Sequence, residues 1–246
     1  MDYMRNQRPY ASASSSAATY DEGLRQYMLG IYNYMTGALA LTGFVAFLVA
    51  NTSLINLFYT VSEGMVKPNL LGYVVMFAPL IMVFYLSARL HHMSVRGAQT
   101  AFMAYAGLMG LSLANIFLVY TGESIVSTLL VTAASFAGLS LYGYTTKRDL
   151  SGFGSFLIMG VIGILIASIV NMFLHSSALH FAISAIGVLV FAGLTAYDTQ
   201  SLRRMYYEVG GSGEAAAKVS IMGALKLYLD FINLFIMLLQ FLGDRR

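Results

Sequence analysis

Two aspartates lie in apolar segments of this chain, where ionised side chains are rare. Asp198 ends the run Phe191–Asp198, and Asp230 lies inside the run Leu227–Phe235. A carboxylate in the core of a bilayer costs about 2.5–3.5 kcal/mol on insertion scales. Such a group must be paired, protonated or hydrated, so these two aspartates are the first candidates for chemistry.

The two carboxyl groups are expected at similar depth, because consecutive helices are usually neighbours. Two carboxyl groups at close range ionise together only at a high cost, so they would share a proton that holds the two helices together. Loss of that proton would leave two negative charges that push the helices apart and attract a cation. Calcium prefers carboxylate and carbonyl oxygens, so it fits as a transient ligand of Asp198 and Asp230.

Separate structural pairs fit the same spacing. Lys226 lies four residues before Asp230, on the same helical face, and could form an ion pair with it. Asn233, three residues after Asp230, could support it through a hydrogen bond. Asp198 has three basic candidates on its own side of the membrane, which are Arg89, Arg203 and Arg204. The spacing alone leaves the functional pair and the separate pairs both open.

The composition excludes a typical soluble enzyme and a disordered chain. Of 246 residues, 58% are hydrophobic and 10% are charged, with 14 Lys and Arg against 11 Asp and Glu. Soluble domains average about 25% charged residues, and disorder needs low hydrophobicity. The chain has no cysteine, and it contains no HExxH, phosphate-loop or dinucleotide motif. We therefore expect no enzymatic activity, no resident cofactor and no nucleic-acid partner.

Seven apolar runs approach the roughly 20 residues that a helix needs to cross a bilayer. The runs are continuous, which favours helices over an alternating β-barrel. The fifth and sixth are joined by only a few residues and should form an antiparallel hairpin. The expected spans are 31–50, 70–88, 98–120, 125–144, 153–174, 179–197 and 224–242. The sequence thus predicts an all-α integral membrane domain over residues 27–246.

Lysine and arginine predict the orientation of these spans. They concentrate in the N-terminal segment and in alternate loops, and such loops face the cytoplasm. This places a polar tail, residues 1–26, in the cytoplasm and the C-terminus outside. The longest inner loop, Thr199–Gly223, is expected to be a mobile segment or a contact surface for a partner.

The two aspartate segments resemble the Bax inhibitor-1 family, also called the transmembrane BAX-inhibitor-motif family, in its bacterial branch. The matching stretches are 191–200, FAGLTAYDTQ, and 225–235, LKLYLDFINLF. The resemblance implies a bundle whose C-terminal helix is central and wrapped by the other six. It also implies a pH-sensitive calcium leak, in which residues matching Asp198 and Asp230 sense protons and gate the pore. An arginine that latches the closed state is implied as well, and Arg89 is the candidate here.

The resemblance also implies functions that involve partners rather than transport. Bacterial members of the family are associated with the membrane protease FtsH, and eukaryotic members with suppression of cell death. A membrane interaction protein that modulates a protease or a stress response is therefore the alternative, with the bacterial inner membrane as the expected location. An intramembrane aspartyl protease is a remote alternative, because no glycine precedes Asp230 in the segment Leu227–Asp230.

Overall fold

The computed structural model describes residues 10–62, 65–210 and 213–246, except for the side chains of 10–21, 61–62, 65–66 and 91. Over these residues the chain forms helices and one small β-hairpin. The elements are α1 (Tyr10–Ala50), η1 (Ser53–Leu57), β1 (Tyr59–Ser62), β2 (Met65–Pro68), α2 (Leu70–Arg89), η2 (Leu90–His92), α3 (Val95–Leu113), α4 (Ile116–Val119), α5 (Gly122–Thr145), α6 (Ser151–Leu174), α7 (Ser177–Glu208) and α8 (Gly213–Leu242).

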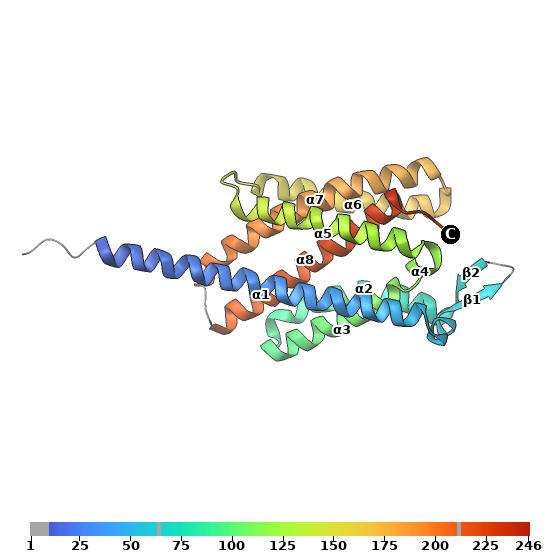
Figure 1. Cartoon of the computed structure of the whole chain (residues 1–246), viewed down its shortest axis with the longest axis horizontal. Coiled ribbons are helices and arrows are strands. Elements are labelled where there is room, and N and C mark those ends of the chain that lie inside the picture. The colour runs from blue at the N-terminus through green and yellow to red at the C-terminus, as the bar shows by residue number, and fades with distance from the viewer. Residues whose placement is uncertain (1–9, 63–64, 211–212) are drawn as a thin grey trace, which may run out of the picture.

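Seven helical segments of the described chain are long and apolar enough to cross a membrane, as the sequence predicts. They pack side by side into an elongated bundle, and the β1–β2 hairpin projects from one end of it (Figure 1). We call this the hairpin end. We call the opposite end, where α3, α6 and α8 begin, the basic end, because it carries many cationic side chains, among them Arg25, Arg96, Lys147, Arg203 and Lys218.

Helix α8 is the most buried of the seven spans. In the most apolar 18-residue stretch of α8, 67% of the residues are buried, whereas in the corresponding stretch of α6 only 11% are buried. Side chains of α8 such as Leu227, Tyr228 and Leu239 are fully enclosed, and α8 packs against α1, α3, α5 and α7. The central position expected for the whole helix stays a prediction, but its burial makes a charged group on α8 costly.

Polar caps fix where several helices begin. The side chains of Asn69, Ser94, Thr121 and Ser176 each accept a hydrogen bond from a backbone N–H in the first turn of the following helix. Such caps satisfy amide groups that the helix itself leaves without partners. Only His175 and Ser176 separate α6 from α7, with His175 in the left-handed conformation at φ 49°. The two helices pack against each other, which confirms the hairpin predicted here.

The structure differs from the sequence prediction at the basic end. Helix α1 begins at Tyr10, inside the segment expected as a tail, and residues 1–9 lie outside the described chain. The segment Thr199–Gly223, expected as a long inner loop, is mostly helix, because α7 continues to Glu208 and α8 begins at Gly213. Hydropathy marks where a helix leaves the apolar core, whereas backbone hydrogen bonds continue wherever the sequence tolerates a helix.

The third span is interrupted. Helix α3 ends at Leu113, and the short helix α4 follows Asn115. The backbone carbonyl of Asn115 accepts hydrogen bonds from Leu118 and Val119, which restart the helix after the break. The interruption lies near the hairpin end, away from the two aspartates.

Candidate functional site

The structure brings Asp198 of α7 and Asp230 of α8 together. Their carboxyl groups lie close enough to interact electrostatically. Asp230 is 5% exposed, and its Oδ2 atom has no hydrogen-bond partner among the described residues. The Asp198 side chain is 13% exposed. The helix–helix contact between α7 and α8 therefore contains two carboxyl groups, of which one is almost fully enclosed.

Lys226 contributes the nearby positive charge, but it does so across the helix interface. Its Nζ atom lies 3.9 Å from Oδ1 of Asp198. The sequence left open an ion pair between Lys226 and Asp230 within one helix; the ion pair observed joins α8 to α7 instead. One lysine thus faces two carboxyl groups, so the three groups carry a net charge of zero only when one proton remains on the pair.

None of the three arginines that the sequence suggests as partners of Asp198 forms an ion pair with it among the described residues. Arg203 donates a hydrogen bond to the backbone carbonyl of Tyr144, and Arg204 binds Asp149 and Ser151. Arg89, the candidate latch, is exposed at the end of α2 and forms no ion pair with any residue that the structure describes. In this conformation, no arginine of the described chain forms an ion pair with Asp198 or Asp230.

The predicted support from Asn233 is also absent in this part of the structure. Its amide donates to the carbonyl of Leu229, in its own helix, at 2.8 Å. A different polar contact holds α8 two residues before Asp230, where the Tyr228 hydroxyl lies 2.7 Å from Oγ1 of Thr42. Thr42 Oγ1 also donates to the Ala106 carbonyl at 2.9 Å, so this buried contact links α1, α3 and α8. Threonine and tyrosine are common in membrane helices, so nothing in the sequence pattern singles out Thr42 and Tyr228.

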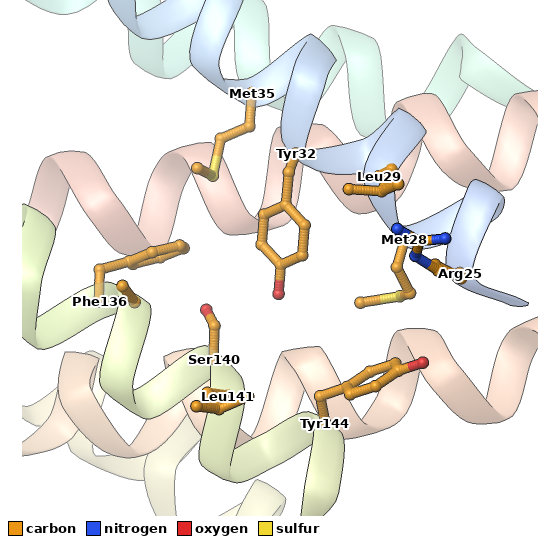
Figure 2. A pocket seen from close by; sticks show the side chains of 10 residues that line it. Arg25, Met28, Leu29, Tyr32, Met35, Phe136, Ser140, Leu141 and Tyr144 are labelled. Carbon is orange, nitrogen blue, oxygen red and sulfur yellow. The ribbon is translucent and has the colours of Figure 1, made fainter.

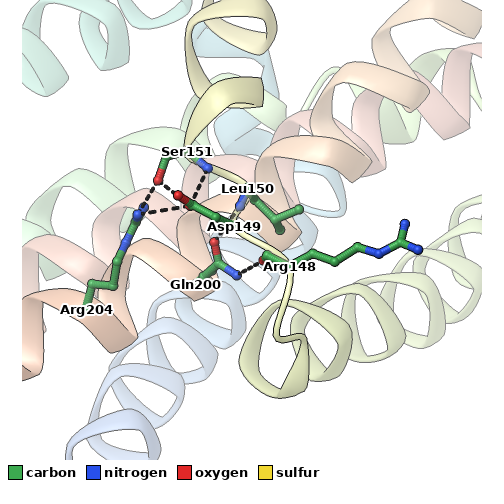
Figure 3. A network of polar contacts seen from close by, with 6 residues as sticks. All are labelled: Arg148, Asp149, Leu150, Ser151, Gln200 and Arg204. Atoms are coloured by element: carbon green, nitrogen blue, oxygen red, sulfur yellow. Dashed lines mark hydrogen bonds and ion pairs between the residues drawn. The ribbon is translucent and has the colours of Figure 1, made fainter.

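A second polar network joins α7 to the loop between α5 and α6 (Figure 3). The amide of Gln200, two residues after Asp198, accepts a hydrogen bond from the Leu150 N–H at 2.8 Å and donates to the Arg148 carbonyl at 2.7 Å. The Asp149 carboxylate accepts hydrogen bonds from the Ser151 hydroxyl and N–H, which hold the pKa of Asp149 below its ordinary value. These contacts fasten the loop to α7 next to Asp198.

The pair could hold a cation only with help from other oxygens. No group of three or more acidic or histidine side chains with the geometry of a metal site occurs among the described residues. Calcium takes six to eight oxygen ligands, so Asp198 and Asp230 would have to act with water or backbone carbonyls.

The fold and this site define a multi-pass α-helical membrane protein with a carboxyl pair buried between its last two spans. Comparison with known proteins agrees with this class. The family model described as "Inhibitor of apoptosis-promoting Bax1" matches residues 24–246. The chain therefore belongs to the Bax inhibitor family, as the aspartate segments predict.

Close relatives occur in several bacteria. The inner membrane protein YbhL of Escherichia coli is 49% identical over 226 residues, which cover 91% of this chain and 94% of YbhL. The protein RP147 of Rickettsia prowazekii is 48% identical over 235 residues, 96% of either chain. A protein of Caulobacter vibrioides is 44% identical over 247 residues, covering 100% of this chain and 99% of its own length.

Proposed function

We propose that this protein is a pH-sensitive leak channel for calcium and related cations, in which the Asp198–Asp230 pair controls the opening. The observation that carries the proposal is Oδ2 of Asp230, a carboxylate oxygen that is buried within a membrane span and has no hydrogen-bond partner among the residues that the structure describes. A polar atom in that state destabilises the bundle, which suggests that it is retained for a second state of the protein. Intramembrane carboxylates commonly mark ion pathways.

Charge balance explains how a proton would act as the gate. When one proton remains on the pair, the positive charge of Lys226 offsets the single negative charge that is left, and α7 and α8 stay in contact. When that proton leaves, the site carries an uncompensated negative charge in surroundings of low dielectric. Repulsion between the two carboxylates then separates α7 from α8, and a cation replaces the lost proton as the neutralising charge.

The position of the pair suggests which compartment it responds to. The basic end of the bundle carries most of the lysine and arginine, and positively charged loops are retained in the cytoplasm. Asp198 lies ten residues before the end of α7 at Glu208, or about 15 Å along the helix. With the basic end in the cytoplasm and the C-terminus outside, the pair would exchange protons with the cytoplasmic side.

Calcium flux into liposomes tests this proposal. The purified full chain should pass calcium at a rate that depends on pH, and Asp198→Asn or Asp230→Asn should abolish that dependence. Asp149→Asn is the matched control, because it makes the same chemical change in an exposed carboxylate outside the spans. Flux no greater than that of empty liposomes at every pH would refute the channel, and an unchanged pH profile in both variants would refute the sensor.

A further inference from the structure

A seam on the side of the bundle separates α1 from α5. Near the basic end it opens into a cavity of about 550 Å³. Figure 2 shows side chains of α1 and α5 facing each other across this space, with the hydroxyl groups of Tyr32 and Ser140 directed into it. Most of the wall is apolar, and the lining residues that matter here are Arg25, Leu29, Tyr32, Phe136, Leu141 and Tyr144.

The seam continues toward the hairpin end as a second apolar cavity of about 460 Å³. It again lies between α1 and α5, with Phe231 and Phe235 of α8 in its wall. The ring of Phe136, which lines the first cavity, packs against the ring of Phe231, which lines the second, with 5.4 Å between their centroids. From Arg25 to Ala46 the lining residues of α1 extend over about 31 Å at 1.5 Å per residue, close to the thickness of a bilayer core.

The surroundings of the seam determine what fills it. It lies along two membrane-spanning helices, and its rim is open to the side, since Leu29 and Leu141 are 49% and 63% exposed. An apolar cavity offers water too few hydrogen-bond partners to retain it. A lipid acyl chain has the matching chemistry and is the molecule that surrounds the protein at this depth.

Positive charge is found at one end of the seam. Arg25 lines the cavity at the basic end, and the exposed residues Lys147 and Arg148 follow α5 at the same end. Arg25 forms an ion pair with Glu22 at 3.5 Å, but both side chains are more than half exposed, so the pair contributes little and leaves the guanidinium accessible. Tyr144, beside the mouth, is of a residue type enriched at the membrane interface.

We propose that an anionic phospholipid binds in this seam, with an acyl chain in the cavity between α1 and α5 and its phosphate at Arg25. The site is separate from the aspartate pair and does not depend on the channel proposal. The bound acyl chain would contact Phe136, whose ring packs against Phe231 of α8. Phe231 is the residue after Asp230, so the lipid site and the aspartate pair both involve helix α8.

The absence of tryptophan from the chain allows a direct test. Leu141→Trp places a single fluorophore in the wall of the cavity. Phe156→Trp is the matched control, because Phe156 is 64% exposed on α6 and lies near the same end of the bundle. The full chain would be reconstituted in phosphatidylcholine vesicles containing a small fraction of acyl-brominated phosphatidylglycerol or, separately, acyl-brominated phosphatidylcholine.

We expect brominated phosphatidylglycerol to quench Leu141→Trp about five-fold more effectively than brominated phosphatidylcholine, the preference that one basic contact provides. The two lipids should quench Phe156→Trp equally. Adding Arg25→Gln to Leu141→Trp should bring the ratio close to one while quenching itself persists. Equal quenching of Leu141→Trp by both lipids, or a ratio that survives Arg25→Gln, would overturn the proposal.

Discussion

Replacing Lys226 with methionine should move the midpoint of the pH response of calcium flux toward higher pH. Methionine keeps the length and the apolar part of the side chain but removes the charge that lies 3.9 Å from Asp198. In the proposed mechanism, opening requires both carboxyl groups to be ionised, and the lysine stabilises that ionised state. Without the lysine charge, a lower proton concentration is needed to remove the last proton from the two carboxyl groups.

The size of this shift follows from the distance. Two unit charges 3.9 Å apart interact by about 4 kcal/mol at an effective dielectric constant near 20. The Lys226 side chain is 39% exposed, so water screens the interaction and leaves about 1–2 kcal/mol. Since one pH unit corresponds to about 1.4 kcal/mol, we expect a shift of about one unit.

Flux measured in liposomes between acid and mildly alkaline pH would give the midpoint. Lys218→Met is the control, because it is the same substitution on the same helix, at a lysine that pairs with Glu214. An unchanged midpoint in Lys226→Met, or an equal shift in Lys218→Met, would refute the charge balance described for the site.

Three further predictions concern the packing that holds the pair in place. Thr42→Val leaves the Tyr228 hydroxyl without its partner and should lower the free energy of unfolding by about 1 kcal/mol, seen as a lower melting temperature in detergent; no change would show that the contact contributes nothing. Gly143→Ala should destabilise the bundle by about 1–3 kcal/mol, because a Cβ there would overlap a backbone carbonyl of α7. The control is Gly138→Ala on the same helix, where the added Cβ meets open space and the effect on stability should be neutral or stabilising. Hydrogen bonds from the hydroxyl and N–H of Ser151 lower the pKa of Asp149, so its stabilising effect is present at neutral pH and is lost as the pH falls through that lowered pKa. Asp149→Asn should therefore reduce the acid-induced drop in melting temperature, and an identical drop would contradict this.

Much of the fold could be predicted from the sequence, because a bilayer imposes a simple requirement on helix length and polarity. The seven spans and the short α6–α7 connection follow from continuous apolar runs. The extension of α7 to Glu208 and the start of α8 at Gly213 do not, because outside the apolar core helix formation depends on local backbone hydrogen bonds that hydropathy does not report.

The sequence likewise predicts one part of the candidate site and not another. That Asp198 and Asp230 meet could be expected, since their depth depends only on position along two antiparallel helices. The partner of Lys226 could not, because side chains on one helical face point equally well along the helix and across to a neighbour. The contacts of Gln200 with the α5–α6 loop depend on how that loop folds back onto α7, which no local pattern specifies.

The most direct test of the central claim is infrared difference spectroscopy of the reconstituted protein between acid and neutral pH. If Asp198 and Asp230 exchange a proton to open the channel, the absorption band of a protonated carboxyl group should disappear over the pH range in which calcium flux rises. The band should be missing in Asp230→Asn and present in Asp149→Asn. A carboxyl band that does not change over that range, or one that persists in Asp230→Asn, would contradict the role of the pair.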